Sequence, residues 1–589
     1  MRRSAEKASF RYLIPLIKYM KRHAILLGFA ILFATVGTVL TVVGPNYIRK
    51  IADIIGEGLY GEPVDIPAVL KTALFLIFLH IISFIMDFFQ SYFMTVTTQK
   101  TGYRLRREIN RKINVLPLKF FDDSMVGDLL SRVTNDVDSI CFTMMQSVGA
   151  LFQAGTQFIG SIIIMMIINW TLAVTAIGAA ALGFVILLLI TKNSQKYFVA
   201  QQAELGCLTG QAEEVYTNHS IVKVYNGEEQ EREKFNTIND RLYNATWKSQ
   251  FLSGIMIPVM GFVGNLGYVA VCVAGAVMAA RGTITFGVVV AFMIYVRLFT
   301  NPLQQLGRIF TQLQGAAAAS KRVFEFLEEE EIEDDSYKER QLSPDRLRGE
   351  IVFEHVKFGY TPDKLIIKDF CAKAEKGQKI AIVGPTGAGK TTLVNLLMRF
   401  YEIEEGRITI DGVDMKEMSR AEVRNLFGMV LQDAWLYEGT FKDNIMFSKN
   451  ATDEEVINAA KMVGIHHFIK TMPQGYDTVL NEEVSVSQGQ RQLITIARAM
   501  VKDAPFLIFD EATSSVDTRT EKMIQEAMDR LMKGRTSFVI AHRLSTIKNA
   551  DLIFVMNNGD IIEQGNHDEL MSKNGFYAEL YNSQFESVE

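Results

Sequence analysis

The sequence predicts a chain in two parts: an α-helical membrane domain of six transmembrane helices with long cytoplasmic extensions, then an α/β P-loop nucleotide-binding domain. Three observations predict this division. The chain has 589 residues, which is too long for a single hydrophobic core. Long apolar runs are concentrated in its first half. A glycine-rich stretch of the phosphate-binding type lies in its second half, at residues 384–391.

The composition excludes several classes of protein. With 61 basic and 66 acidic residues, the net charge is −5, which provides no electrostatic basis for a nucleic-acid partner. The four cysteines lie far apart and form no Cys-x-x-Cys pair. Their spacing therefore indicates neither a disulfide framework nor a zinc site.

Six apolar spans are predicted within a membrane domain of residues 1–327. The first follows a basic start and exceeds the apolar part of a signal peptide, so we interpret it as a helix that enters the membrane from the cytoplasm. Ser139–Thr191 contains no charged residue and is about twice the ~20 residues of one span, so it must hold two helices, with Asn169 and Trp170 at the outer turn. The spans cover about residues 24–43, 72–96, 140–168, 171–191, 251–280 and 284–306.

The charge of the connecting segments predicts the orientation. Six spans return the chain to its starting side, which places the long charged segments 100–138 and 192–248 in the cytoplasm. The outer connections are short and poor in basic residues. Both termini of this multi-pass protein are therefore expected on the cytoplasmic side of the cell membrane. The inner segments have a helical composition, so the membrane helices are expected to extend beyond the bilayer.

A linker and a second domain follow. Residues 328–348 form the linker, which begins with an acidic run that should repel itself and stay solvated. Residues 349–589 alternate apolar strands with helical patterns, as is typical of an α/β domain.

The second domain contains a complete phosphate-binding loop. The strand-like run Ile380–Val383 leads into the pattern G-x-x-x-x-G-K-[ST] and then into a helix, whose positive N-terminus favours phosphate. Lys390 would neutralise the β- and γ-phosphates, and the Thr391 hydroxyl would ligate Mg²⁺. The predicted nucleotide contacts are Gly384, Pro385, Thr386, Gly387, Ala388, Gly389, Lys390, Thr391 and Thr392.

Two further apolar strands deliver polar residues to the same crevice. Phe506–Phe509 precedes Asp510 and Glu511, and Ser537–Ala541 precedes His542. In open parallel sheets the ligand lies beyond the carboxyl ends of the strands. Phosphoryl transfer to water needs a metal, a group that orients the water and donors for the developing charge. Asp510 is therefore predicted to hold Mg²⁺, Glu511 to polarise water, and His542 to donate to the γ-phosphate.

Over essentially the whole chain, these features resemble the ATP-binding cassette exporters that fuse six membrane helices to one nucleotide-binding domain. The most specific part is Val486–Gln492, which resembles the family signature. The resemblance implies that Ser487, Gly489 and Gln490 contact the ATP held by the opposite subunit, at the start of a helix from about Gln490. Without the phosphate loop, the same residues would indicate only an ordinary serine-capped helix.

Other positions match the family one by one. Tyr360 matches the aromatic residue that stacks on adenine, and Gln432 matches the glutamine that senses Mg²⁺ and the attacking water. Residues 514–517 match the loop that crosses the dimer interface. Phe120–Asp122 and Gly127–Arg132 match the first inner loop, where a short coupling helix rests on the ATPase domain.

The resemblance also implies a partner. The family's closed state holds two ATP molecules between two nucleotide-binding domains, and this chain has one such domain. A second half-transporter subunit is therefore expected. The signature departs from the usual Leu-Ser-Gly-Gly at Val486 and Gln488, whereas Glu511 and His542 are intact, which slightly favours a heterodimer over a homodimer.

The leading functional hypothesis is ATP-driven, multidrug-type export of hydrophobic or amphiphilic compounds across a bacterial cytoplasmic membrane. ATP-induced dimerisation would drive alternating access. A lipid or peptide exporter of the same family remains open, while the apolar spans and intact catalytic set oppose a soluble or regulatory cassette ATPase. Expected partners are ATP, Mg²⁺, membrane lipid and an amphiphilic substrate. Asp87 and Arg297, at apparent membrane depth, are expected to face a cavity or pair with each other.

Overall fold

The computed structural model describes residues 10–58, 63–124, 126–338, 342, 347–361, 363–447, 449–481, 486–510, 517–541 and 544–585. The chain divides into two compact units. The membrane unit comprises Met1–Asn114 and Val126–Glu329, and the nucleotide unit comprises Val115–Met125 and Glu330–Glu589. A short segment from the first half of the chain thus belongs to the nucleotide unit.

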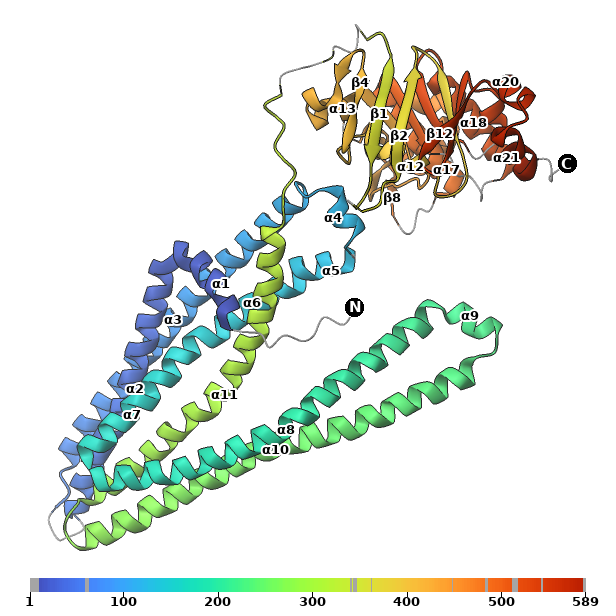
Figure 1. Cartoon of the computed structure of the whole chain (residues 1–589). Helices are drawn as coiled ribbons and strands as arrows, with labels where there is room; N and C mark the ends of the chain where they lie inside the picture. Colours follow the sequence, from blue (N-terminus) through green and yellow to red (C-terminus); the bar gives the residue numbers. More distant parts are fainter. Residues whose placement is uncertain are drawn as a thin grey trace. The chain divides into compact units, whose positions relative to one another are not determined.

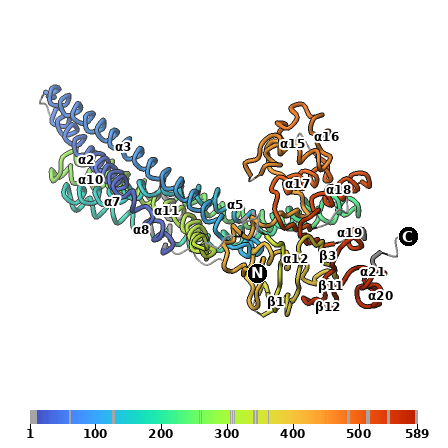
Figure 2. Tube along the Cα trace, turned by 90° about the horizontal axis from the view of Figure 1, so that it is seen from above, coloured from blue at the N-terminus to red at the C-terminus, as the bar shows by residue number. Residues whose placement is uncertain are grey.

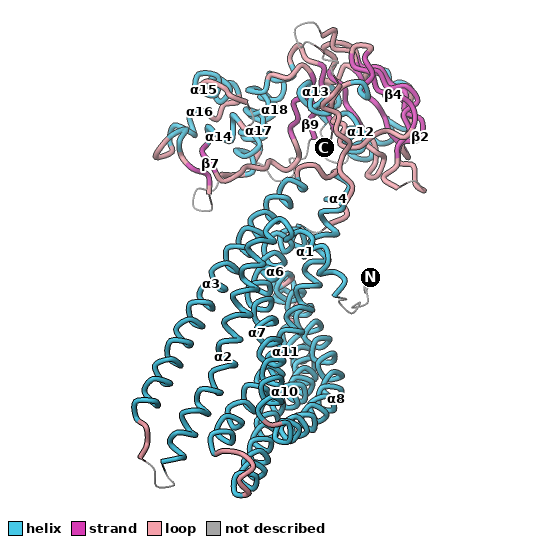
Figure 3. The backbone as a smooth tube through the Cα atoms, turned by 90° about the vertical axis from the view of Figure 1, so that its left-hand side faces the viewer, coloured by secondary structure: helices cyan, strands magenta, loops and turns pink. Residues whose placement is uncertain are grey.

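The described residues of the membrane unit form helices joined by short turns, and every strand in Figure 3 lies in the nucleotide unit. Two π-helical stretches, η3 (Arg132–Asp136) and η4 (Met144–Val148), join α5, α6 and α7 into one continuous run. The helices of this unit are α1 (Leu13–Met20), α2 (Ala24–Gly58), α3 (Ile66–Ile113), α5 (Val126–Ser131), α6 (Val137–Thr143), α7 (Gly149–Ile168), α8 (Trp170–Thr217), α9 (His219–Val224), α10 (Glu228–Ala280) and α11 (Phe286–Glu328).

Among the described residues, 5 helices are long and apolar enough to cross a membrane. A shorter apolar stretch, Trp170–Gly183, begins α8 at the position of the fourth predicted span. The chain is therefore a multi-pass membrane protein, and the count of six spans stays a prediction. The predicted turn is present, because Asn169 leaves the helical conformation and its side chain accepts a hydrogen bond from the Leu172 N–H at 3.1 Å. Its position on the outer side of the membrane stays a prediction.

The membrane helices extend well past the length that a bilayer requires, as predicted. α10 has 53 residues. At ~1.5 Å per residue this is about 80 Å, against a hydrocarbon core of ~30 Å. α8 and α10 lie side by side, and α9 connects their far ends (Figure 1).

The two ionisable residues at membrane depth have partners other than each other. The Asp87 carboxylate accepts a hydrogen bond from Gln153 Nε2 at 3.2 Å. The Arg297 guanidinium lies 5.7 Å from the centre of the Tyr268 ring. Of the two expectations, pairing of Asp87 with Arg297 is therefore wrong, since a cation–π contact engages the arginine instead. A position that faces a cavity stays a prediction.

The nucleotide unit contains two main sheets. The antiparallel sheet has the order β2-β1-β4-β5, and the larger sheet has the order β12-β11-β3-β10-β9-β6, in which only β12 pairs antiparallel. The strands are β1 (Ile351–Phe358), β2 (Ile367–Ala374), β3 (Lys379–Val383), β4 (Glu405–Ile410), β5 (Val413–Asp414), β6 (Phe427–Val430), β7 (Gly439–Thr440), β8 (Val479–Leu480), β9 (Phe506–Asp510), β10 (Thr536–Ile540), β11 (Leu552–Asn557) and β12 (Asp560–Gly565).

Both faces of the larger sheet are covered. One face packs against α17 and α18 near β9 and against α20 and α21 near β11, and the other packs against α12 and the antiparallel sheet. In Figure 2, α15, α16 and α17 accordingly lie at one end of the unit, and α20 and α21 lie at the other. The helices of this unit are α4 (Leu118–Asp122), α12 (Lys390–Leu397), α13 (Arg420–Leu426), α14 (Phe441–Met446), α15 (Asp453–Met462), α16 (His466–Thr471), α17 (Gln488–Lys502), α18 (Thr518–Met532), α19 (Leu544–Lys548), α20 (His567–Ser572) and α21 (Phe576–Phe585).

The acidic run after α11 is not wholly solvated, which corrects the expectation from its charge. The Asp335 side chain is only 16% exposed, and its carboxylate accepts hydrogen bonds from the Arg420 backbone N–H at 2.9 Å and guanidinium at 3.1 Å. Arg399 lies 3.6 Å from the same carboxylate. Two cations outweigh the repulsion within the run and fix this end of it to the nucleotide unit.

Candidate nucleotide-binding site

Four parallel strands end together at one edge of the larger sheet. Ile382 pairs with Ile540, Ile540 pairs with Asp510, and Phe509 pairs with Val430. Because the four strands are parallel and in register, the residues that follow each of them meet at the same edge. The phosphate loop, Asp510 and the segment after β6 therefore lie at the same edge of the sheet, and the predicted roles of these residues stay predictions.

The phosphate loop needs glycine at both ends. A Cβ atom on Gly384 would lie 2.3 Å from the Met556 carbonyl oxygen, so a side chain there would displace the loop from β11. Gly389 has φ 100, in the left-handed region, immediately before the first residue of α12. The chain can therefore turn sharply from β3 into α12, which leaves the first N–H groups of the helix at the sheet edge.

Lys390 lies inside the curve of this loop. Its Nζ donates hydrogen bonds to the carbonyl oxygens of Gly384 at 2.6 Å and Pro385 at 3.1 Å. Burial lowers the pKa of the lysine, and the negative charge of Asp510 acts in the opposite direction. The positive charge is thus held beside the loop and close to the predicted metal ligand.

Tyr360 is brought to the helix that follows the loop. Its hydroxyl lies 3.3 Å from Thr392 Oγ1 and accepts a hydrogen bond from Asn395 Nδ2 at 3.3 Å. Its ring packs edge-on against Phe358 at 5.1 Å and Tyr401 at 5.0 Å between ring centres. The residue predicted to stack on adenine therefore belongs to the same site as the loop.

The remaining predicted catalytic residues are placed only in part. Thr391 is exposed in the first turn of α12, and Gln432 is exposed two residues beyond the end of β6. Asp510 is the last residue of β9. Glu511, His542 and residues 514–516 of the predicted interface loop lie outside the described residues.

The signature residues begin α17. Ser487 Oγ accepts a hydrogen bond from the Gln490 N–H at 3.3 Å, and the Gln490 side chain accepts one from the Ser487 N–H at 2.9 Å. This reciprocal capping box starts the helix at Gln488, two residues before the predicted start. Ser487 is exposed and Gly489 is buried. Contacts of these residues with a partner's ATP stay a prediction.

A connection that sequence reasoning missed joins α4 to the nucleotide site. The Tyr401 hydroxyl donates a hydrogen bond to the Asp122 carboxylate at the end of α4, although the two residues are 279 positions apart. Burial, followed by this hydrogen bond, raises the pKa of Tyr401. Since Tyr401 also packs on Tyr360, contacts run without a break from α4 to the predicted adenine-binding residue. No sequence pattern signals a contact over this separation.

The arrangement can bind a phosphate chain. Loop N–H groups, a helix N-terminus and Lys390 supply positive potential, while Asp510 supplies an oxygen ligand for a hard cation. A site of this kind, in a chain that also crosses the membrane several times, defines an ATP-hydrolysing membrane transporter.

Comparisons with known proteins agree with this class. Residues 27–303 match the family described as ABC transporter transmembrane region, and residues 367–514 match the family described as ABC transporter. A fatty acid ABC transporter ATP-binding/permease protein of Mycobacterium bovis is 44% identical over 522 residues, which cover 88% of this chain and 82% of the relative. An ATP-dependent lipid A-core flippase of Sodalis glossinidius is 35% identical over 505 residues, covering 85% and 86%.

A solved structure, that of a bacterial Atm1-family ABC exporter with ATP bound, is similar with a TM-score of 0.76 and 28% identity, covering 95% of this chain and 98% of that one. The chain belongs to the ABC transporter family, as a half-transporter of the exporter type. It binds and hydrolyses ATP to drive export, and it acts as a dimer of half-transporters.

Proposed function

We propose that this half-transporter exports an amphiphile with long acyl chains, a fatty acid or a lipid, across a bacterial cytoplasmic membrane. The similarity that carries this proposal is the 44% identity to a protein named as a fatty acid ABC transporter. The similarity to a lipid A-core flippase supports the same chemical class. An acyl substrate is one kind of hydrophobic or amphiphilic compound. The two similarities therefore favour the lipid exporter over multidrug-type or peptide export.

Each group of residues at the sheet edge would have a separate role in ATP hydrolysis. The loop N–H groups and Lys390 would hold the phosphates of ATP. Mg²⁺ fits the oxygen donors of Thr391, Gln432 and Asp510, and it would neutralise charge on the phosphates when bound. Glu511 would orient the attacking water.

His542 and Tyr360 would complete the site within the chain. His542 would donate to the γ-phosphate, and Tyr360 would stack on adenine. The signature of a second half-transporter would complete the nucleotide site of this chain. In turn, Ser487, Gly489 and Gln490 of this chain would contact the ATP bound by that partner. The altered signature slightly favours an unlike partner. ATP binding would close the two nucleotide-binding domains on each other, and hydrolysis would release them. This cycle would alternate the membrane halves between inward- and outward-facing states, with both termini in the cytoplasm.

The test uses the purified assembly with its native partner, reconstituted in vesicles with the nucleotide-binding domains facing outward. We expect ATP-dependent movement of a labelled acyl lipid to the inner leaflet, together with stimulation of hydrolysis by acyl amphiphiles. Glu511→Gln, in an assembly with no other competent site, should retain ATP binding and lose both activities.

Three other outcomes would change the proposal. If hydrophobic cations and peptides stimulate ATP hydrolysis to the same extent as acyl compounds, multidrug-type export would be favoured. Hydrolysis without movement of any acyl compound would contradict the proposed substrate class. Normal turnover in the Glu511→Gln assembly would contradict the catalytic assignment.

A further inference from the structure

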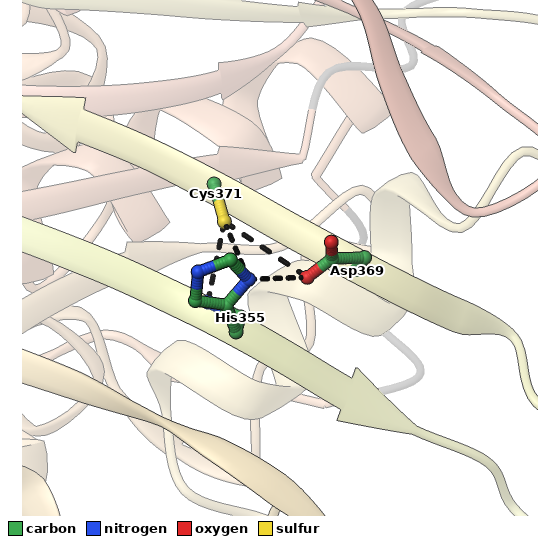
Figure 4. Close-up of side chains that lie close together, drawn as sticks. All are labelled: His355, Asp369 and Cys371. Atoms are coloured by element: carbon green, nitrogen blue, oxygen red, sulfur yellow. Dashed lines mark hydrogen bonds and ion pairs between the residues drawn. The ribbon is translucent and has the colours of Figure 1, made fainter.

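The exposed face of the antiparallel sheet carries a cluster of three potential metal ligands, remote in sequence from the phosphate loop. His355 lies on β1, and Asp369 and Cys371 lie on β2 (Figure 4). All three side chains are exposed, and their ligand atoms lie within 4.8 Å of one another. Imidazole, carboxylate and thiolate are the ligands that proteins use for zinc and related divalent ions.

A bulge in β1 brings the histidine to this face. Phe353 pairs with Ala372 and Val356 with Phe370, so two residues of β1 lie opposite Cys371 alone. His355 takes up the extra residue with φ 48, a left-handed conformation in which histidine is more frequent than most residues. Its backbone N–H donates to Cys371 Sγ at 3.3 Å.

The two ligands on β2 share a face because they are two positions apart. Alternate residues of a strand point to the same side, and the intervening Phe370 is fully buried in the core. The Asp369 backbone is held by its N–H, which donates to Asp560 Oδ1 at 3.1 Å on the neighbouring β12. The buried neighbour and this hydrogen bond therefore fix the position of the β2 ligands.

The distances suit tetrahedral coordination with little movement. His355 Nδ1 lies 3.5 Å from Cys371 Sγ and 2.9 Å from Asp369 Oδ1, and Sγ lies 4.0 Å from Oδ1. With metal bonds of ~2.0–2.3 Å, tetrahedral ligands are separated by about 3.3–3.6 Å. The Nδ1–Oδ1 pair would widen by about 0.4 Å as the metal replaces the hydrogen-bonding proton, and the Sγ–Oδ1 pair would close by a similar amount.

The orientation of the imidazole distinguishes a metal site from a nucleophilic triad. In a triad, the carboxylate and the nucleophile lie on opposite nitrogens of the histidine. Here Asp369 and Cys371 both face the same nitrogen, Nδ1. Three lone-pair donors therefore converge on one point, which is the requirement for a cation and provides no relay for a proton.

The surrounding charges permit a cation at this point. Lys357 is the cation that acts electrostatically with Asp369, but its ammonium is paired with Glu405 at 2.6 Å. The Asp560 carboxylate adds negative charge behind the Asp369 backbone. Since the Lys357 ammonium is paired and the Asp560 carboxylate is negative, these two groups are compatible with a divalent ion.

We propose that His355, Asp369 and Cys371 bind Zn²⁺, or another late first-row divalent ion that accepts a thiolate, with water in the fourth position. The ion would join β1 to β2 on the outer face of the nucleotide unit. This site is independent of the proposed transport function, because it shares no residue with the nucleotide site.

The primary test is zinc binding by the full chain in detergent, without nucleotide and without a polyhistidine tag. We expect one zinc ion per chain at this site, measured by equilibrium dialysis after removal of metals by a chelator. Co²⁺ in place of zinc should show thiolate-to-cobalt charge-transfer absorption.

Variants identify the ligands. Cys371→Ser should abolish the charge-transfer band and lower zinc affinity by at least about tenfold, since even changes behind a metal ligand cost 10–100-fold. His355→Asn, which tolerates the left-handed backbone, should lower the affinity to a similar extent. Cys207→Ser, at an exposed cysteine on α8, is the matched control and should change neither measurement.

Thiol alkylation gives a second readout that does not depend on variants. Zinc should slow alkylation of Cys371 and leave that of Cys207 unchanged, as measured by mass spectrometry of peptides from the native protein. Equal protection of both cysteines, or zinc binding that survives Cys371→Ser unchanged, would overturn the proposal. Absence of cobalt–thiolate absorption in the unmodified chain would overturn it as well.

Discussion

The nucleotide unit and the membrane unit use their apolar residues in opposite ways. In the nucleotide unit, strands β3, β9 and β10 are almost wholly buried between layers of the same unit. In the membrane unit, only 6% of the most apolar stretch of α3 is buried within the chain, so most of its apolar surface faces outward. The nucleotide unit thus buries its apolar residues within itself, whereas the apolar surface of α3 is of the kind that a bilayer would cover.

The two units differ in the same way in their chemistry. The phosphate chain of a nucleotide is strongly anionic and its groups are tetrahedral, so a fixed loop with a glycine at each end and a lysine inside its curve suits it. The acyl chains of the proposed substrate would need only an apolar surface in the membrane unit, and many side chains can supply one. Single substitutions should therefore have large effects in the nucleotide site and small ones on membrane-facing positions.

The largest effect is expected at the phosphate loop. Lys390→Ala should lower ATP hydrolysis by at least about 100-fold in an assembly with no other competent site, because removal of one group that stabilises transition-state charge typically costs 10²–10³. Phosphate release measures turnover. Lys368→Ala, at an exposed lysine of β2, is the control and should retain full activity. Comparable loss in both variants would show that general surface charge, and not the loop, supports hydrolysis.

A pair of identical substitutions tests the contrast in packing. Phe538 on β10 is fully buried, whereas Phe84 on α3 is 71% exposed. Phe538→Ala should destabilise the nucleotide unit by ~3–5 kcal/mol, and Phe84→Ala should change the stability of the membrane unit by less than about 1 kcal/mol. Hydrogen exchange of peptides from each unit of the full assembly measures the two effects separately. Equal effects at the two positions would break the comparison between the units.

The hydrogen bond between Tyr401 and Asp122 tests whether hydrolysis in the nucleotide unit is coupled to transport by the membrane unit. α4 comes from the membrane half of the sequence but belongs to the nucleotide unit. Tyr401→Phe removes only the hydrogen bond, which is worth ~0.5–1.5 kcal/mol, or up to ~3 with a charged partner. We expect basal hydrolysis within about twofold of normal and a clear fall in substrate moved per ATP hydrolysed.

Tyr437→Phe is the control for this coupling, since it lies in the same unit and should preserve the ratio of transport to hydrolysis. A parallel fall of transport and hydrolysis in Tyr401→Phe would indicate damage to the nucleotide site through Tyr360. That result would argue against a coupling role for the hydrogen bond.

The parts of the molecule that sequence reasoning predicted are those with local or periodic signals. The apolar runs, the outer turn at Asn169 and the phosphate loop are each encoded within a short stretch. Convergence of the strand ends also followed, because parallel strands share an edge whatever their order.

The parts that it missed depend on register and on distant side chains. The spacing of the cysteines indicates no zinc site, because the proposed site has only one cysteine. Cys371 meets its fellow ligand His355 only through a bulge on the neighbouring strand. Asp335 was expected to be solvated, because the cations that hold it, Arg399 and Arg420, come from elsewhere in the fold. Pairing of Asp87 with Arg297, one of the two arrangements that their predicted membrane depth suggests, does not occur because Gln153 and Tyr268 contact them instead.

The smallest expected effect concerns helix ends, which also differ between the units. Long α10 follows the N-cap residue Gly227, which provides no side-chain cap, whereas short α14 begins with a capping box between Thr440 and Asp443. A helix of six residues depends more on its ends than a helix of 53. Hydrogen bonds from the Thr440 hydroxyl and backbone N–H lower the pKa of the Asp443 carboxyl.

The lowered pKa of Asp443 decides how the stability of α14 depends on pH. Because the folded pKa is depressed, the cap contributes stability above the unfolded value of ~3.9 and loses it as the pH falls through the folded value. The carboxylate is exposed, so solvent screening limits the effect to well under about 1 kcal/mol.

Asp443→Asn should therefore remove part of the acid sensitivity of α14, measured as hydrogen exchange of its peptide between pH 6 and pH 3 after correction for intrinsic rates. Glu404→Gln, at an exposed position before β4, should leave that sensitivity intact. If both variants exchange like the unmodified chain across this range, the cap contributes nothing to the stability of the helix.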